Sequence, residues 1–331
     1  MKSFNLKGIF KNYSNYRIKQ LKRAIFVNLI EDWSLCTSLP KEVREDLNNR
    51  YPLKIKAREV YSKDKRTIKL LLTLDDGLKI ESVLMRYKDG RNSVCVSTQV
   101  GCPLGCKFCA TGKIGFKRNL EWNEIIEQVI YFARLLKKEK GKITNIVFMG
   151  MGEPFLNYEN VKKSIQILNY KDGFNLGMRR FSISTVGIPK MILKLAEDLP
   201  QVNLAISLHA PNDKLRSKLM PINKKYPISI VLKAVDQYIE ITNRRVMFEY
   251  IMINNVNDKE ENAYELAELL KNKLCFINLI PCNKVNDYIP STKEAVNQFK
   301  AILTKNNITV IQRYSFGQDI EAACGQLVGK S

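Results

Sequence analysis

The chain has 331 residues, of which 45% are apolar, so it can bury a full core as one large domain with an appendage or as two domains. Its 54 Lys and Arg against 33 Asp and Glu give a net charge of +21, which favours a polyanionic partner such as nucleic acid; a lysine-rich AT-biased genome is the alternative explanation. The polar, basic stretch 1–20 and the lack of a long apolar run exclude a signal peptide and a membrane span, so we expect a cytoplasmic protein.

Residues 1–90 are predicted to form a small, basic α+β accessory domain, because they carry 20 Lys and Arg against 11 Asp and Glu. Apolar residues recur at helical spacing over 16–30, and a proline opens a second helix over 40–49. Two alternating runs, 67–74 and 79–85, flank a turn sequence and predict a β-hairpin. The first helix carries cations that could follow RNA phosphates: Arg17, Lys19, Lys22 and Arg23.

From residue 91 to residue 331, short apolar strands alternate with longer amphipathic helices, which is typical of repeated βα units. The predicted strands are Ser93–Thr98, Ile143–Met149, Phe181–Thr185, Val202–Leu208, Val246–Met252, Phe276–Pro281 and Thr309–Gln312. The predicted helices lie near 122–138, 158–169, 189–197, 229–242, 259–271 and 292–305. About six units are too few to close an eightfold barrel, so we predict an α/β fold, a partial TIM-like (βα)6 barrel with its site at the carboxyl ends of the strands.

Three of the eight cysteines, Cys102, Cys106 and Cys109, fall on one short loop after the first of these strands. A structural zinc ion normally takes four protein ligands, and no second cysteine pair or histidine pair accompanies the loop. Three thiolates on a four-iron cluster would instead leave one iron open for another ligand. We therefore predict a redox-active iron–sulfur cluster; zinc completed by a distant cysteine and incidental clustering are the alternatives.

The Cys-x-x-x-Cys-x-Phe-Cys spacing, with Phe108 before the last cysteine, resembles the signature of the radical S-adenosylmethionine (SAM) superfamily. Within it, the chain resembles the RlmN/Cfr family of radical SAM RNA adenine methyltransferases from about residue 16 to residue 326. The motifs that carry this resemblance are Gln99-Val-Gly-Cys, Gly112–Leu120, Gly150-Met-Gly-Glu-Pro154, Ser184-Thr-Val-Gly187, Ile206–Asn212, Met220-Pro-Ile-Asn223, Ile277–Pro281 and Asp319–Gln326.

The resemblance implies a [4Fe-4S] cluster, two SAM molecules and two further cysteines. Carbon 2 or carbon 8 of adenine is electron-poor and cannot attack a SAM methyl group, so a cysteine thiolate takes the methyl first. A radical from the second SAM then activates that methyl, which adds to the ring, and another cysteine releases the adduct by forming a disulfide. By resemblance Cys324 is the methylated residue and Cys95 the resolving thiol; without it, both would be interpreted as buried apolar cysteines. Cys36, Cys275 and Cys282 are expected to be structural.

The remaining expected site residues also follow from the resemblance. Glu81 matches the glutamate that moves the ring proton, although an ordinary hairpin glutamate is the alternative. Gly152 and Glu153 are expected to meet the amino end of SAM, since a carboxylate suits an ammonium group. Other SAM contacts are expected at Ser184, Ser207, Leu208, His209 and Asn283. His209 has a second interpretation as a core histidine at a strand end.

The expected substrate is an unpaired or extruded adenine in 23S rRNA, with transfer RNA as a second RNA partner and an electron donor such as flavodoxin. Within the resemblance, Pro154 and Leu156-Asn157 fit the carbon-2 type better. The stretch 105–112 and the residues around Phe316-Gly317 are also similar to the carbon-8 type, which stays the alternative. A radical SAM enzyme acting on a small molecule or a protein, and a zinc-stabilised RNA-binding protein, are the other hypotheses. Beyond the first helix, RNA contacts are expected at Lys113, Lys117 and Arg118.

Overall fold

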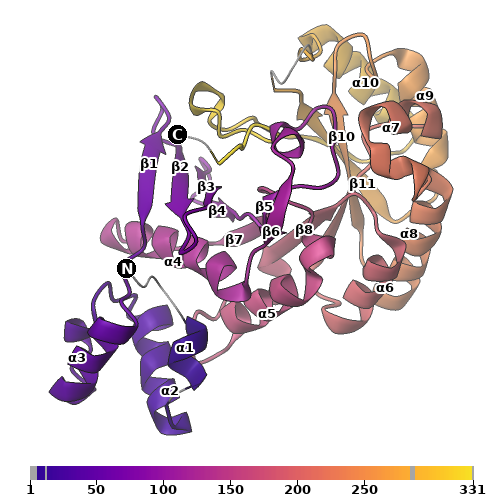
Figure 1. Ribbon diagram of the computed structural model, residues 1–331. Helices are drawn as coiled ribbons and strands as arrows, with labels where there is room; N and C mark the ends of the chain where they lie inside the picture. The colour runs from indigo at the N-terminus through magenta and orange to yellow at the C-terminus, as the bar shows by residue number, and fades with distance from the viewer. Residues whose placement is uncertain (1–5, 12, 284–287, 330–331) are drawn as a thin grey trace.

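The computed structural model describes residues 6–11, 13–283 and 288–329, and it begins with a small helical unit (Figure 1). This unit contains α1 (Leu6–Lys11), α2 (Asn15–Lys22), a π-helical turn (Arg23–Val27), a 3-10 turn (Trp33–Leu35) and α3 (Lys41–Arg50). Trp33 is fully buried in it and donates its indole N–H to Tyr51 O at 2.7 Å. The helix predicted over 16–30 therefore exists as α2, but it changes to π-helical geometry and ends at Val27.

The centre of the molecule is one ten-stranded sheet in the order β1-β2-β3-β4-β7-β8-β9-β10-β11-β12. The strands are β1 (Ala57–Tyr61), β2 (Thr67–Thr73), β3 (Lys79–Arg86), β4 (Asn92–Cys95), β7 (Asn145–Phe148), β8 (Phe181–Thr185), β9 (Asn203–Ser207), β10 (Val246–Met252), β11 (Cys275–Pro281) and β12 (Val310–Gln312). From β4 to β12 every pairing is parallel, whereas β1 to β4 pair antiparallel. The predicted α/β fold with a partial barrel of βα units is confirmed.

Six amphipathic helices connect the parallel strands and follow the outside of the curved sheet (Figure 1). They are α4 (Trp122–Lys138), α5 (Tyr158–Asn169), α6 (Pro189–Asp198), α8 (Ile228–Thr242), α9 (Glu260–Leu269) and α10 (Lys293–Lys305), each within two residues of the predicted bounds. Their apolar stripes cover strands of which β10 and β11 are almost wholly buried, as is typical of central parallel strands, whereas the edge strand β12 is partly exposed. The short helix α7 (Asp213–Leu219) was not predicted.

The predicted hairpin is present as β2 and β3, which pair antiparallel. It is continuous with the main sheet, because β3 pairs with β4 and so extends the parallel part by three antiparallel strands. The helical unit is also tied to the large domain, since the buried Arg134 of α4 donates to Leu53 O at 2.9 Å and to Ile30 O. A domain boundary near residue 90 stays a prediction; in the structure, that residue lies in the turn between two hydrogen-bonded strands.

Candidate active site

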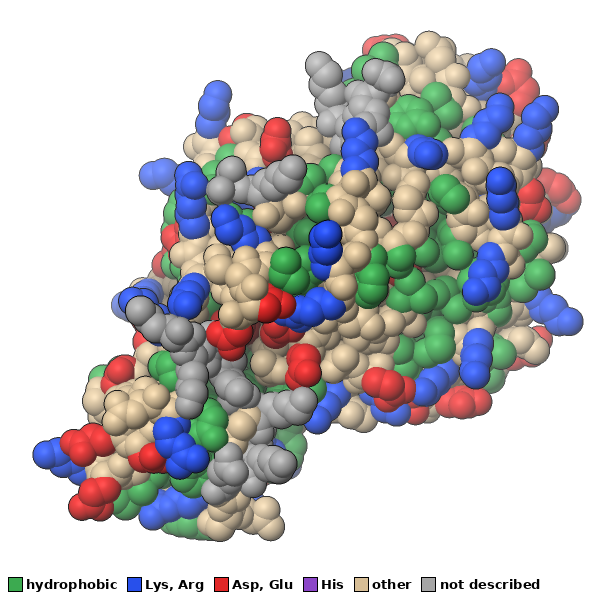
Figure 2. All heavy atoms as spheres, in the orientation of Figure 1, with side chains coloured by type: hydrophobic (Ala, Val, Ile, Leu, Met, Phe, Trp, Pro, Cys, Tyr) green, Lys and Arg blue, Asp and Glu red, His purple; other side chains and the backbone are tan. Residues whose placement is uncertain are grey.

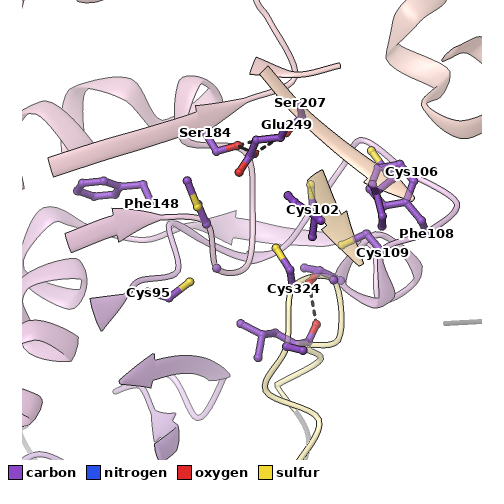
Figure 3. Close-up of a pocket in the computed structure, with 18 of the residues that line it drawn as sticks. Cys95, Cys102, Cys106, Phe108, Cys109, Phe148, Ser184, Ser207, Glu249 and Cys324 are labelled. Atoms are coloured by element: carbon purple, nitrogen blue, oxygen red, sulfur yellow. Dashed lines mark hydrogen bonds between the residues drawn. The ribbon is translucent and has the colours of Figure 1, made fainter. Parts of the chain in front are cut away.

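A cavity opens at the carboxyl ends of the parallel strands and has a volume of about 1280 Å³, counting the space at its mouth. Figure 3 shows the residues that line it, which come from the cysteine loop, the strand ends and the C-terminal segment 313–327. Ten of the expected site residues lie here together: Cys95, Cys102, Cys106, Cys109, Gly152, Glu153, Ser184, Ser207, His209 and Cys324. Three expected residues, Glu81, Leu208 and Asn283, do not line the cavity.

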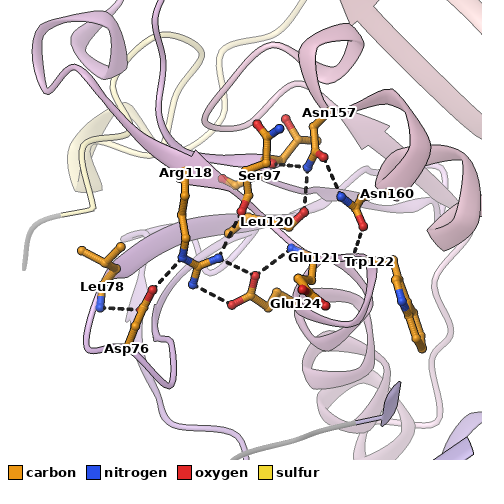
Figure 4. A network of polar contacts seen from close by, with 12 residues as sticks. Asp76, Leu78, Ser97, Arg118, Leu120, Glu121, Trp122, Glu124, Asn157 and Asn160 are labelled. Atoms are coloured by element: carbon orange, nitrogen blue, oxygen red, sulfur yellow. Dashed lines mark hydrogen bonds and ion pairs between the residues drawn. The ribbon is translucent and has the colours of Figure 1, made fainter. Parts of the chain in front are cut away.

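The cysteine loop is held in shape by a small two-stranded sheet of β5 (Gln99–Gly101) and β6 (Phe116–Asn119), which flanks it on both sides. Gly101 is required there, because its φ is +74° and a Cβ atom would lie 1.7 Å from Gly115 O. Arg118 fastens β6 to the rest of the fold: it pairs with Asp76 at 2.6 Å and with both oxygens of Glu124 at 2.8 Å (Figure 4). The loop is therefore anchored at its base before any cofactor binds.

The three loop cysteines have donor chemistry that suits an iron–sulfur cluster. Among the described residues, no three His, Cys, Asp or Glu side chains converge closely enough to hold a single ion. In a cluster each cysteine binds a different iron, whereas a structural zinc ion normally takes four protein ligands at one point. Burial raises the pKa of Cys102 to about 12 and raises that of Cys106 as well, so both are neutral thiols until metal displaces the proton.

Cys324 is brought into the cavity by the C-terminal segment, which hydrogen bonds fasten to distant parts of the chain. Ala110 N–H donates to Gly325 O at 2.7 Å, and the Thr111 hydroxyl donates to Leu327 O at 2.7 Å. Asn283 donates its side-chain amide to Cys324 O at 2.9 Å. Asn283 therefore positions the cysteine rather than lining the cavity itself.

Cys95, at the end of β4, and Cys324 approach the same space from different segments, and both are free thiols (Figure 3). Burial raises the pKa of Cys95 to about 12. The pKa of Cys324 is also raised by desolvation, and the guanidinium of Arg313 acts against this rise. Arg313, which lines the cavity, is thus placed to favour a thiolate at Cys324.

Glu249, in the middle of β10, is a buried carboxylate in the cavity wall that the sequence analysis did not single out. One of its oxygens, Oε2, accepts hydrogen bonds from Ser184 and, at 3.4 Å, from Ser207 (Figure 3). The other, Oε1, accepts no hydrogen bond within the described part of the chain and lies 3.7 Å from Arg313 Nη1. A buried acceptor without a donor is costly, so Oε1 suits a donor group on a ligand.

Gly152 and Glu153 form a tight turn after β7. The φ of Gly152 is +99°, and a Cβ atom there would lie 2.5 Å from the side chain of Gln99. Glu153 accepts backbone N–H groups from Phe155 and from Val186, both at 3.0 Å, which ties the turn to the end of β8. Burial raises the pKa of Glu153 to about 7, and its carboxylate lines the cavity near the cysteine loop.

His209 follows β9 in a left-handed conformation with a φ of +61°. Its Nδ1 accepts from Ile251 N–H at 3.1 Å, and its ring packs edge-on against Phe108 of the cysteine loop at 4.8 Å between centroids. Burial lowers its pKa to about 3, so the ring is neutral. Its backbone N–H donates to Glu249 O, and its C=O accepts from the side-chain amide of Asn257. Both backbone groups are therefore satisfied within the protein, and the ring supports the cysteine loop through its contact with Phe108. Leu208 is fully buried in the core.

Glu81 lies beside the cavity, under the last described residues of the chain. Its Oε2 accepts the backbone N–H groups of Val328 at 2.7 Å and Gly329 at 3.2 Å, and its Oε1 lies 3.3 Å from Lys69 Nζ. The side chain is almost wholly inaccessible to solvent. In this conformation Glu81 fastens the C-terminal segment to β3.

The cations that were expected to contact RNA differ in their solvent exposure and in whether they already form ion pairs. Lys113 and Lys117 are exposed beside the cysteine loop, as are Lys19 and Arg23 on the first helix. Arg118 is neutralised by Asp76 and Glu124 and is unsuited to hold a phosphate (Figure 4). Lys and Arg side chains are spread over the face in Figure 2 rather than gathered on the N-terminal helices.

Within the described residues, no helix is long and apolar enough to cross a membrane.

Comparisons with known proteins agree with this geometry. A family model described as "Radical SAM superfamily" matches residues 96–267. A "Probable dual-specificity RNA methyltransferase RlmN" of Dictyoglomus thermophilum is 48% identical over 95% of this chain and 90% of that protein. A protein of the same description from Spiroplasma citri is 46% identical over 96% and 92%. A crystal structure of a radical SAM methyltransferase from Sphaerobacter thermophilus superposes with a TM-score of 0.94 at 45% identity, covering 98% of this chain and 96% of that one.

Sequence identity at this level over nearly the whole length establishes the protein family as well as the fold. The family uses a [4Fe-4S] cluster and SAM, and the cavity places three cysteines and the polar strand ends where both would bind. The non-enzymatic, zinc-stabilised alternative is not supported, and neither is a substrate other than RNA. The chain belongs to the RlmN family of radical SAM RNA methyltransferases.

Proposed function

We propose that this protein methylates carbon 2 of an unpaired adenine in 23S rRNA, and an anticodon-loop adenine of transfer RNA as a second substrate. The observation that carries the proposal is the meeting of Cys324 and Cys95 with the three loop cysteines in one cavity. A radical SAM enzyme that only generated a radical would need the loop cysteines alone. The distant pair supplies what methylation of an electron-poor ring carbon requires, a methyl carrier and a thiol that releases it.

Cys324 is the carrier in this proposal. Its thiolate displaces S-adenosylhomocysteine from one SAM and keeps the methyl group on sulfur. Arg313 favours the thiolate, and Asn283 and Ala110 fix the segment that presents it. The bound cluster supplies the electron that cleaves a second SAM and so produces the radical that activates the methyl group. Cys324 is exposed within the cavity, so an entering adenine can reach the methyl group on its sulfur.

Cys95 is the resolving thiol. After the methylene carbon on Cys324 has bonded to the ring, the Cys95 thiolate attacks the Cys324 sulfur and a disulfide forms. The sulfur–carbon bond breaks, its electron pair stays with the carbon, and that carbon takes a proton to become the methyl group of the product. Glu81 is proposed to move the ring proton, in keeping with the family resemblance. Because Val328 and Gly329 occupy its Oε2, that role requires the end of the C-terminal segment to move away from β3.

A Cys95→Ala variant is expected to stop after its first turnover and to accumulate protein covalently joined to RNA, because no thiol remains to break the sulfur–carbon bond. Denaturing gels with labelled RNA would show the adduct as a band of reduced mobility. A Cys95→Ala, Cys324→Ala double variant is the control and should form no adduct. Multiple turnovers by Cys95→Ala, or an adduct in the double variant, would contradict the assignment.

The choice of carbon 2 rests on Pro154 and on Leu156-Asn157, which fit the carbon-2 type, and on the match to relatives described as RlmN. Mass spectrometry of nucleosides from ribosomal RNA incubated with the enzyme tests it. Accumulation of 2-methyladenosine is expected, and 8-methyladenosine would replace the proposal with carbon 8. The same measurement on transfer RNA decides whether it is a second substrate.

Glu249→Gln is expected to weaken SAM binding about tenfold, because hydrogen bonds to a charged acceptor contribute about 1.5–3 kcal/mol. The carboxylate also organises Ser184 and Ser207, which are proposed SAM contacts. Equilibrium dialysis with cluster-containing protein under anaerobic conditions measures the affinity. Glu268→Gln, an exposed glutamate on α9, is the matched control. Equal SAM affinity in both variants would show that Glu249 does not face the ligand.

A further inference from the structure

Three aromatic rings lie in a row at the mouth of the cavity. Phe316 packs edge-on against Tyr87 at 4.8 Å and against Tyr314 at 5.0 Å between ring centroids. Phe316 is buried and lines the cavity, whereas Tyr314 also lines it but exposes 57% of its surface. A residue that is both exposed and part of the lining lies at the rim, so Tyr314 is the rim residue of the row; Tyr87, at the other end, does not line the cavity.

A guanidinium group fixes the exposed ring. Arg66 lies over Tyr314 at 5.1 Å from the centroid, and its Nη2 donates to the Tyr314 hydroxyl at 2.9 Å. At the other end of the row, Arg91 lies over Tyr87 at 4.4 Å. These contacts hold the rings in place before any ligand arrives, which lowers the entropic cost of binding to them.

The charges of this cluster are already balanced. Arg66 pairs with Asp64 at 2.8 Å, and Arg91 pairs with Asp89 at 2.8 Å. The two arginines that touch these rings are therefore neutralised, and what Tyr314 itself offers is flat aromatic surface. Such a surface binds nucleobases, which stack on aromatic faces in single-stranded RNA, and it is poorly suited to hold phosphates.

Packing explains Phe316 and Tyr87, whereas Tyr314 keeps 57% of its surface exposed even with Arg66 over its ring. Single exposed aromatic residues are common, and Tyr264 on α9 is a comparable example at 52% exposure. Tyr314 differs because it is fixed by Arg66, lies at the entrance to the cavity and shares a segment with Cys324. An adenine that entered the cavity would bring its neighbouring nucleotide to this ring.

We propose that Tyr314 is a stacking platform for the unpaired RNA base next to the target adenine. The inference rests on the proposed function, in which an extruded adenine enters the cavity. Stacking of the neighbour keeps the adenine out of its own helix, because a base held at the rim can no longer stack within the RNA. The interaction recognises an unpaired nucleotide and tolerates different bases, since every base has an aromatic face.

The test is binding of a short hairpin RNA whose unpaired loop carries the target adenine next to 2-aminopurine, a base whose fluorescence falls when it stacks. Tyr314→Ala is expected to weaken binding about tenfold and to lose the quenching. Tyr314→Phe keeps the ring and should stay within about threefold of the unmodified protein. Because the substitution removes an uncharged side chain, the salt dependence of binding should be the same for Tyr314→Ala as for the unmodified protein.

Tyr264→Ala is the matched control, an equally exposed tyrosine on a helix away from the cavity. SAM affinity and melting temperature of Tyr314→Ala show whether the Cys324 segment is intact. If Tyr314→Ala and Tyr264→Ala bind and quench alike, the platform is disproved while the methyltransferase assignment stands. If the unmodified protein binds SAM but no hairpin RNA, the proposed RNA substrate is contradicted, and the stacking inference that rests on it is contradicted as well. A reduced salt slope in Tyr314→Ala would mean a phosphate contact instead of stacking and would overturn the inference.

Discussion

Cys324→Ala is expected to lower RNA methylation at least about 10³-fold while leaving reductive cleavage of SAM intact, because only the methyl carrier is removed. The cluster loop and the strand-end contacts do not depend on the Cys324 side chain; the segment is held by the backbone groups of Gly325 and Leu327. Liquid chromatography would measure two products separately, 5′-deoxyadenosine from SAM cleavage and methyladenosine from RNA.

The control is Cys275→Ala, which removes a different free thiol, one that is buried at the start of β11 and lies away from the cavity lining. It should keep most of its methylation activity, since deletion of one sulfur from the core costs only about 1 kcal/mol of stability. A Cys324→Ala protein that still methylated RNA would show that the methyl group travels by a route that needs no cysteine at this position.

Replacing any one of the loop cysteines, most clearly Cys106→Ala, is expected to abolish both SAM cleavage and methylation. A [4Fe-4S] cluster with two protein ligands loses iron, and without the electron it supplies no radical forms. Anaerobically purified protein should change from brown to nearly colourless and lose its bound iron and sulfide. The loss is expected to exceed that of Cys324→Ala, because both half-reactions depend on the cluster.

Cys36→Ala is the control here, since that cysteine is buried in the helical unit before α3. It should retain iron at the level of the unmodified protein. Iron analysis that gave equal contents for Cys106→Ala and Cys36→Ala would remove Cys106 from the ligand set. Zinc in place of iron in the unmodified protein would contradict the cluster assignment itself.

The parallel part of the fold could be predicted because its signals are local. Strands such as β8 and β10 are short apolar runs between helices with clear periodicity, and both have the predicted bounds. The extension of the sheet through β3 could not be predicted from local patterns. The hydrophobic pattern of a strand shows that the strand exists, but it does not show which other strand it pairs with. The pair β5 and β6 was missed for a similar reason, since each is only three or four residues long.

The site was predictable where residue type and spacing are unusual, as in the cysteine loop. Glu249 and Arg313 carry no such signal: each is a single charged residue in or beside an apolar strand. A charge in the middle of the buried run of β10 was nonetheless a usable clue, because buried carboxylates need partners. Glu81 shows the opposite case, since its motif predicted a role whereas its contacts depend on residues almost 250 positions away.

The hydrogen bonds that fasten the C-terminal segment also affect the order in which the protein folds. Thr111 bonds to Leu327 across 216 positions of the chain, and Glu81 bonds to Val328 across 247. Contacts of such long range close late, because the loop entropy is lost before the contacts are gained. The sheet and the cysteine loop can therefore form first, and Cys324 enters a pocket that already exists. We therefore expect the reactive thiol to be the last part of the active site to be assembled during folding.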